Sequence, residues 1–115
     1  LGNLEAKRDW GHAKDYVVAM WLMLQQKKPR DYVVSTGRQY SVKQFAELAF
    51  KLAGLDYKKY VKIDKKLERP ADVLTLLGDC KKVKKELKWK EKFTFKELVR
   101  DMVESDIKFV KKEGY

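Results

Sequence analysis

The sequence predicts one small α/β unit that is rich in helices and holds two or three short strands. With 115 residues, the chain has the length of a single domain. Its 44% hydrophobic and 12% aromatic residues suffice for a packed core and exclude a disordered or fibrous chain. Several segments repeat their apolar residues every three or four positions, which indicates amphipathic helices. Two shorter segments have the composition or the alternation that is typical of strands.

The first helix is expected over residues 11–26, and Pro29 ends it. Its predicted buried face consists of apolar residues at helical spacing: Ala13, Tyr16, Val17, Met20, Trp21 and Leu24. Residues 31–35 are β-branched and aromatic, and they are predicted to form a strand that leads into a turn at Thr36 and Gly37.

The second helix is expected to follow Ser41, because Ser41 and Gln44 have the spacing of a capping box. Gly54 is expected to end this helix. Its predicted buried face comprises Val42, Phe45, Leu48, Ala49 and Leu52. Residues 60–64 alternate apolar and polar side chains and are predicted to form a second, half-buried strand.

Two further helices are expected in the last third of the chain. Asp79 is predicted to cap a short helix that carries Val83 and Leu87, with Trp89 filling an apolar corner behind it. Thr94 and Glu97 have the spacing of another capping box. The predicted buried face of the last helix consists of Leu98, Val99, Met102, Val103, Ile107 and Val110.

The charge balance is strongly basic, with 27 basic against 17 acidic residues and a net charge of +10. This leaves a basic nucleic-acid-binding module open as an alternative. However, 22 of the basic residues are lysine and five are arginine. Bidentate binding of phosphate and hydrogen bonding to base edges depend on arginine. The lysines of the densest cluster, residues 81–85, are therefore predicted to form a solvated face. The prediction is that the chain has no nucleic-acid partner.

Membrane, disulfide and metal classes are also excluded by the sequence. The longest apolar run, residues 17–24, is far shorter than the about twenty residues that a membrane span requires. Cys80 is the only cysteine, which rules out an internal disulfide framework and makes a reducing, cytoplasmic setting the expectation. His12 is the only histidine, so it is interpreted as a non-ligand residue near a helix start, and no metal site is predicted.

A self-contained catalytic or cofactor site is also not expected. The six glycines do not have the spacing of a dinucleotide-binding fingerprint or a P-loop. No tyrosine is followed by a lysine four residues later, so the couple that serves hydride transfer to nicotinamide is missing. Any catalysis therefore depends on groups outside this chain.

Two strings carry a specific resemblance. The first is LGNLEAKRDWGHAKDYV at residues 1–17, and the second is RPADV at residues 69–73, followed by GDCKKVKKELKWK at residues 78–90. Together with the Thr-Gly and Ser-Val pairs at residues 36–37 and 41–42, they occur in the order of one family. Over essentially its whole length, the chain resembles the carboxy-terminal, substrate-binding part of the GDP-mannose 4,6-dehydratases, which belong to the extended short-chain dehydrogenase/reductase family.

The resemblance implies that residues 1–115 form the nucleotide-sugar-binding lobe of a longer enzyme and that the Rossmann half is absent from this chain. It implies a parent lyase that uses NADP to convert GDP-mannose into GDP-4-keto-6-deoxy-mannose and water. In the family that the chain resembles, the hydride leaves C4, water leaves across C5 and C6, and the hydride returns at C6. No catalytic residue and no bound cofactor is implied for this chain, which alone would be inactive. The parent would be a cytoplasmic homodimer or homotetramer.

The resemblance also implies a substrate site. Arg8 and Arg69 would hold the pyrophosphate of GDP-mannose, because arginine forks onto phosphate oxygens. Asp72, where the family usually has glutamate, would accept a hydrogen bond from a ribose hydroxyl. Asn3 and Leu4 would lie near guanine. Lys7 completes the predicted set.

Two alternatives for these residues remain open. On spacing alone, Arg8 and Arg69 can equally form ordinary salt bridges with acidic neighbours: Asp9 or Asp15 for the first, and Glu68 or Asp72 for the second. The chain can also be the substrate lobe of another nucleotide-sugar epimerase or reductase, in which the base-contacting segment would differ.

Overall fold

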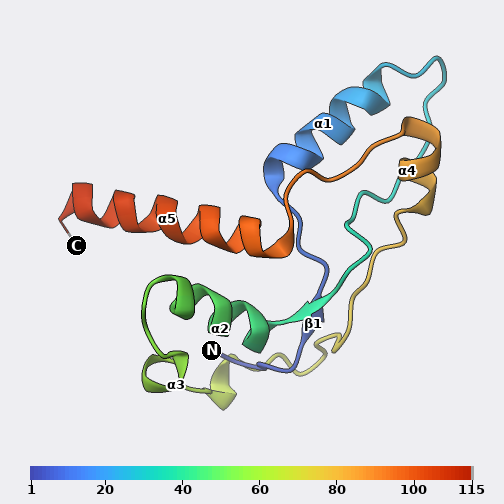
Figure 1. Cartoon of the computed structure of the whole chain (residues 1–115). Coiled ribbons are helices and arrows are strands. Elements are labelled where there is room, and N and C mark those ends of the chain that lie inside the picture. The colour runs from blue at the N-terminus through green and yellow to red at the C-terminus, as the bar shows by residue number, and fades with distance from the viewer. Residues whose placement is uncertain (115) are drawn as a thin grey trace.

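The computed structural model describes residues 1–114 and measures 52 × 38 × 20 Å along its principal axes. Figure 1 shows two groups of helices joined by a small sheet. The helices α1 (Ala13–Leu24) and α4 (Lys81–Leu87) pack together at one end. At the other end, α2 (Val42–Leu52) packs against α5 (Phe95–Glu113) and against the short helix α3 (Tyr57–Tyr60).

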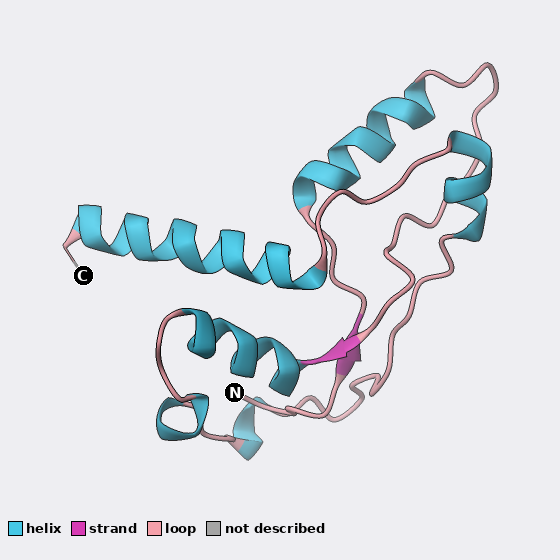
Figure 2. Ribbon diagram, viewed as in Figure 1, coloured by secondary structure: helices cyan, strands magenta, loops and turns pink. Residues whose placement is uncertain are grey.

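The sheet has two short strands, as Figure 2 shows. In antiparallel register, β1 (Lys7–Arg8) pairs with β2 (Tyr40–Ser41), so that Lys7 lies opposite Ser41. On the other side of β1, the backbone N–H of Lys7 donates to the Leu74 carbonyl at 2.7 Å, and that of Leu76 donates to the Lys7 carbonyl at 3.0 Å. The N-terminal segment therefore lies between two segments that are distant in sequence.

Helices α1 and α4 share one buried cluster. Its members are Ala19, Cys80, Val83, Leu87 and Trp89, and the side chains of Tyr32 and Val34 pack against it. The Trp89 indole N–H donates to the Asp15 carbonyl oxygen at 2.9 Å, which fixes the corner after α4 to the first turn of α1. The predicted apolar role of Val83, Leu87 and Trp89 is confirmed.

A second, aromatic cluster joins β2, α2 and α5. The rings of Tyr40 and Phe95 stack with their centroids 3.9 Å apart, and the rings of Trp10 and Phe45 meet edge to face at 5.1 Å. Both predicted capping boxes are present, Ser41 with Gln44 and Thr94 with Glu97. Leu98 and Val99 of α5 are buried as predicted, whereas Met102 is 46% exposed.

Both strand predictions are wrong. Residues 31–35 form no strand, because their backbone N–H and C=O groups meet no neighbouring strand within residues 1–114. Tyr60 is the last residue of α3, and residues 61–64 have no regular structure before the short 3₁₀ helix η1 (Lys65–Leu67). Asp56, which caps α3 by accepting from the Lys58 N–H at 3.1 Å, is the local signal that competes with the alternating pattern.

The predicted buried face of α1 is wrong except at Tyr16, which packs against the cluster that α1 shares with α4. Val17, Met20 and Trp21 are each 60% exposed, and Leu24 is 82% exposed. The residues of α1 that are buried are Asp15 and Ala19, on the side that faces α4. The four exposed apolar side chains have the spacing i, i+3, i+4 and i+7, so they form one stripe along the helix, which we call the α1 stripe.

No helix within residues 1–114 is long and apolar enough to cross a membrane.

The start of α4 differs in detail from the prediction. The N-cap residue is Cys80, and the Asp79 carboxylate accepts from the Lys81 N–H at 3.1 Å.

Two lysines of the predicted solvated cluster have partners. The Lys82 ammonium donates to the Asp31 carbonyl at 2.7 Å, and the Lys84 ammonium lies 3.1 Å from a Glu91 carboxylate oxygen.

His12 connects the start of α1 to α5. Its Nδ1 accepts from the Lys14 N–H at 3.1 Å, which caps α1, and its Nε2 lies 2.7 Å from a carboxylate oxygen of Asp101 on α5. The imidazole also stacks on Phe93 with the centroids 4.0 Å apart. Because Nδ1 accepts, Nε2 carries the proton and donates to Asp101. This hydrogen bond from His12 holds the pKa of Asp101 below its usual value of 3.8.

We expect the Asp101 carboxylate to contribute stability that is present above about pH 4 and is lost as the pH falls below 3.8, because its pKa is lowered in the folded state. An Asp101→Asn variant keeps a carbonyl acceptor for His12 but does not titrate. Its urea midpoint, followed by circular dichroism, should therefore fall less steeply below pH 4 than that of the unmodified chain. Asp106→Asn, on an exposed part of α5, is the control. Identical pH slopes for all three proteins would contradict this expectation.

Candidate nucleotide-sugar site

A cleft of about 250 Å³ lies where the N-terminal segment meets the loop after η1. It is lined by Leu1, Gly2, Asn3, Ala6, Arg8, Val42, Leu67, Glu68, Arg69 and Asp72. Backbone hydrogen bonds hold the N-terminal segment in place along both sides. The Ala6 carbonyl accepts from the Val42 N–H at 2.9 Å, and the Leu1 carbonyl accepts from the Asp64 N–H at 2.7 Å.

Gly2 permits the close approach of these two segments. A Cβ atom at Gly2 would lie 2.9 Å from the Leu67 carbonyl oxygen, which is closer than a side chain tolerates. Sequence reasoning missed Leu67 and Glu68 as lining residues. Their one sequence signal is that they directly precede the Arg69-Pro70 pair.

The structure brings Arg8 and Asp72 together across the cleft. The Arg8 Nη2 lies 2.9 Å from Asp72 Oδ1, and the two side chains are 25% and 26% exposed. Arg8 Nη1 also donates to the Lys7 carbonyl at 2.8 Å and to the Leu74 carbonyl at 3.4 Å. The guanidinium is thus held at the cleft by one carboxylate and two carbonyls. Of the salt bridges left open by the sequence, the Arg8 pairs with Asp9 or Asp15 do not form.

Arg69 reaches the same cleft but is exposed, and its guanidinium has no hydrogen-bond or ion-pair partner within the described part of the chain. Its backbone carbonyl accepts from the Asp72 N–H at 3.3 Å, which makes a turn of residues 69–72. The salt bridges of Arg69 with Glu68 or Asp72, which the sequence left open, do not form either. The cleft therefore holds one paired and one unpaired arginine.

The other predicted site residues divide into two groups. Asn3 lines the cleft, and its Oδ1 accepts from the Glu5 N–H at 2.9 Å. Leu4 and Lys7 do not belong to the lining. The Leu4 carbonyl accepts from the Lys43 N–H at 3.0 Å, and Lys7 lies in β1, where successive side chains point to opposite faces. Since Arg8 faces the cleft, Lys7 faces away from it.

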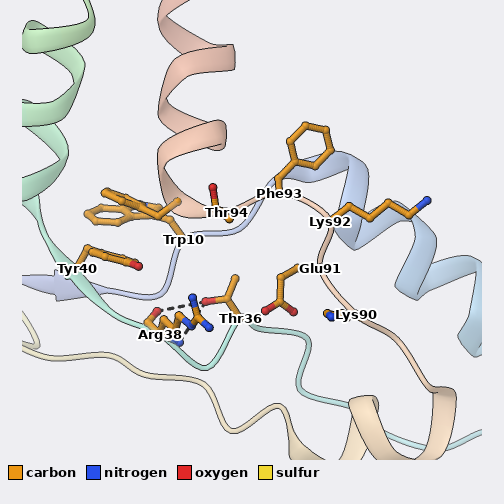
Figure 3. A pocket seen from close by; sticks show the side chains of 10 residues that line it. Trp10, Thr36, Arg38, Tyr40, Lys90, Glu91, Lys92, Phe93 and Thr94 are labelled. Carbon is orange, nitrogen blue, oxygen red and sulfur yellow. Dashed lines mark hydrogen bonds between the residues drawn. The ribbon is translucent and has the colours of Figure 1, made fainter.

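A second hollow, of about 160 Å³, lies between β2 and the start of α5, and Figure 3 shows the side chains around it. Trp10, Tyr40 and Thr36 line one side of it, and residues 90–95 line the other. The turn at Thr36 is fixed by Asp9, whose Oδ1 accepts from the Thr36 hydroxyl at 2.6 Å. Glu91 is neutralised by Lys84, and the hollow contains none of the residues predicted for the site.

The described residues also bear on whether the chain could hold a metal ion or a phosphate-containing ligand. Within residues 1–114, no three His, Cys, Asp or Glu side chains are grouped so that they could hold a metal ion. The cleft offers two guanidinium groups, two carboxylates and an amide, which suit a ligand with phosphates and hydroxyl groups.

Comparisons with known proteins give the fold its class. The structure superposes on UDP-glucose 4-epimerase of Thermotoga maritima, solved with UDP-glucose, with a TM-score of 0.82 and 26% identity over 96% of this chain and 34% of that one. It matches dTDP-glucose 4,6-dehydratase of Bacillus anthracis, solved with NAD, with a TM-score of 0.83 and 21% identity over 93% of this chain and 33% of that one. The fold is thus one that nucleotide-sugar epimerases and dehydratases contain.

The sequence comparison is more specific. The model of the GDP-mannose 4,6 dehydratase family matches residues 1–102. GDP-mannose 4,6 dehydratase 1 of Arabidopsis thaliana is 51% identical over 113 residues, which cover 98% of this chain and 31% of the relative. The chain belongs to the GDP-mannose 4,6-dehydratase family, and it spans about a third of the length of the curated relatives that it matches.

Proposed function

We propose that this chain is the GDP-sugar-binding part of a GDP-mannose 4,6-dehydratase, the lyase that makes GDP-4-keto-6-deoxy-mannose and water from GDP-mannose. The observation that carries the proposal is the convergence of Arg8, Arg69 and Asp72 on one cleft in a member of this family. In this role, the two guanidinium groups bind the diphosphate, Asp72 accepts from the ribose, and Asn3 lies near guanine. Leu4 and Lys7, which lie outside the lining, act only through the backbone bonds that fix the N-terminal segment.

Cofactor binding and catalysis are proposed to reside in the part of these enzymes that lies outside the matched third. That part would hold NADP, which takes the hydride from C4 of the sugar and returns it at C6. The residues of this chain would bind and orient the nucleotide so that the sugar projects from the cleft. The full enzyme is proposed to be a cytoplasmic homodimer or homotetramer without a membrane or nucleic-acid partner.

Two exposed features support the proposal that another part of the enzyme packs against this chain. The α1 stripe leaves Val17, Met20, Trp21 and Leu24 in solvent, which a self-sufficient domain rarely tolerates. Residues 31–35 alternate like a strand, since Tyr32 and Val34 face the core while Val33 is 56% exposed, but they have no partner strand within residues 1–114. We propose that the cofactor-binding part covers the α1 stripe and pairs with residues 31–35.

The proposal is tested on the enzyme that contains this chain and on the 115-residue chain alone. The enzyme should bind GDP more tightly than UDP, and the chain alone should show no turnover of GDP-mannose with NADP. A preference for UDP would favour the substrate lobe of another epimerase or reductase. Binding of duplex DNA with a steep salt dependence would favour the nucleic-acid alternative. Measurable turnover by the purified chain would refute the assignment of catalysis to another part.

A further inference from the structure

The two groups of helices meet through directional polar contacts. The buried cluster of α1 and α4 and the aromatic cluster of β2, α2 and α5 have no residue in common. Between these two clusters, the start of α1 lies beside the start of α5, as Figure 1 shows. Hydrogen bonds have preferred angles, whereas apolar burial is non-directional. Polar contacts at this place therefore fix the angle between the two groups.

Two side chains at the first turn of α1 make these contacts. The Asp15 carboxylate accepts from the N–H groups of Lys92 and Phe93, each at 3.0 Å, in the segment that enters α5. The imidazole of His12 bonds to Asp101 on α5 at 2.7 Å and stacks on Phe93 with the centroids 4.0 Å apart. His12 is 7% exposed and Asp15 is 4% exposed. We call this set of contacts the α1–α5 joint.

The joint lies between two surfaces that have different roles in the proposed enzyme. The cleft belongs to the group of α2 and α5, because Val42, the first residue of α2, lines it and α2 packs against α5. The α1 stripe belongs to the group of α1 and α4, and the cofactor-binding part is proposed to cover it. The angle at the joint thus relates the bound nucleotide sugar to the part of the enzyme that performs the chemistry.

We infer that the α1–α5 joint places the sugar of the bound substrate against the reacting groups of the enzyme, with His12, Asp15 and Asp101 as positioning residues. None of the three lines the cleft, so a change at the joint moves the sugar and leaves the nucleotide contacts intact. A displacement of about 1 Å can lower a rate by about a hundredfold. The inference rests on the proposed function, because it assumes that the cleft binds the substrate.

The test breaks the joint from each side in the enzyme that contains this chain. Asp101→Ala removes the acceptor on α5, where the aspartate side chain is 50% exposed, so the fold should persist. His12→Asn keeps a favoured N-cap residue for α1 but removes the imidazole that bonds to Asp101. Each variant should lower kcat for GDP-mannose by about threefold to thirtyfold. The Kd of GDP, measured by isothermal titration, should change by less than about twofold.

Three further variants separate positioning from a general loss of structure. Asp101→Asn keeps a carbonyl acceptor for His12 and should retain most of kcat. Asp106→Ala is the matched control for Asp101→Ala, because it makes the same change at an exposed residue of α5 and should leave kcat unchanged. The double variant of His12→Asn and Asp101→Ala should lose no more than His12→Asn alone, since both substitutions remove the same hydrogen bond.

Amide hydrogen exchange gives a readout that is independent of turnover. In Asp101→Ala and in His12→Asn, the N–H groups of Lys92 and Phe93 should exchange faster, because the segment that enters α5 is held by fewer contacts. Exchange in residues 1–8 and 66–72, which contribute most of the cleft lining, should stay unchanged. Thermal melting verifies that each variant is folded at the temperature of the assay.

The inference would be overturned if kcat stayed unchanged in both variants. A rise in the Kd of GDP by the same factor as the fall in kcat would also overturn it, because the joint would then only maintain the cleft. Equal losses of kcat in Asp101→Ala and Asp106→Ala would have the same meaning. A failure of the proposed function is seen separately, in the unmodified enzyme, as a preference for UDP over GDP. The comparison of kcat with Kd is then made with the UDP-sugar that the enzyme accepts.

Discussion

Trp89→Ala is expected to lower the free energy of unfolding by about 3–5 kcal/mol, the usual cost of removing a large buried aromatic side chain. Trp89 is 3% exposed and packs in the cluster of Ala19, Val83 and Leu87. Its removal leaves a cavity between α1 and α4, and it leaves the Asp15 carbonyl without the indole N–H. Domains of this size are stable by only about 5–15 kcal/mol, so the variant should be partly unfolded at moderate temperature.

Trp21→Ala is the matched control, because it makes the same chemical change at a residue that is 60% exposed. In the 115-residue chain it should change the free energy of unfolding by no more than about 0.5 kcal/mol. Urea unfolding followed by circular dichroism measures both variants without depending on tryptophan fluorescence. Equal losses would mean that the α1–α4 cluster is not the core of this end of the molecule. In the longer enzyme, Trp21→Ala should become destabilising, because the cofactor-binding part is proposed to cover the α1 stripe.

Sequence patterns predicted the elements whose signals are local. The capping boxes at Ser41 and Thr94 involve residues three positions apart, and both form as predicted. Gly54 follows the end of α2 with a φ of +75°, a conformation that favours glycine, so the predicted stop is also correct. Such signals involve only residues close together in the sequence, so they do not depend on contacts with the rest of the chain.

The α1 stripe shows the limit of periodicity. The pattern identifies an apolar helix face but does not say which neighbour covers it, and here no segment of residues 1–114 does. The side of α1 that is buried carries Ala19 and Asp15, which contribute little to an apolar pattern. Asp15 is 4% exposed because its carboxylate accepts from the Lys92 and Phe93 N–H groups, each at 3.0 Å. These partners are too distant in sequence for a local pattern to reveal them.

The candidate site was predicted only in part, because it also depends on contacts between residues that are distant in sequence. Family resemblance selected Arg8, Arg69 and Asp72, and the structure brings these residues to one cleft. The ion pair of Arg8 with Asp72 depends on residues 74–76 lying along β1, a long-range contact that neither composition nor spacing indicates. Lys7 was included with the site residues that the family resemblance implies. Strand alternation, which was not predicted for residues 7–8, is what turns its side chain away.

Arg8→Ala and Arg69→Ala are each expected to weaken GDP-mannose binding about tenfold to a hundredfold in the enzyme that contains this chain, because each removes a charge-assisted contact worth roughly 1.5–3 kcal/mol. Arg69→Ala should show the larger loss. Arg69 has no competing partner within residues 1–114, whereas part of the gain from Arg8 is offset by separating it from Asp72.

Arg100→Ala is the matched control for both arginine variants, since Arg100 lies exposed on α5 and does not line the cleft. Lys85→Ala, on the exposed side of α4, serves the same purpose for the lysine-rich cluster and is preferable to Lys84→Ala, because Lys84 holds Glu91. Isothermal titration with GDP-mannose compares all four variants. If Arg100→Ala or Lys85→Ala reduced the affinity as much as Arg8→Ala does, diffuse positive charge would bind the ligand, and the assignment of Arg8 and Arg69 to the diphosphate would have to be abandoned.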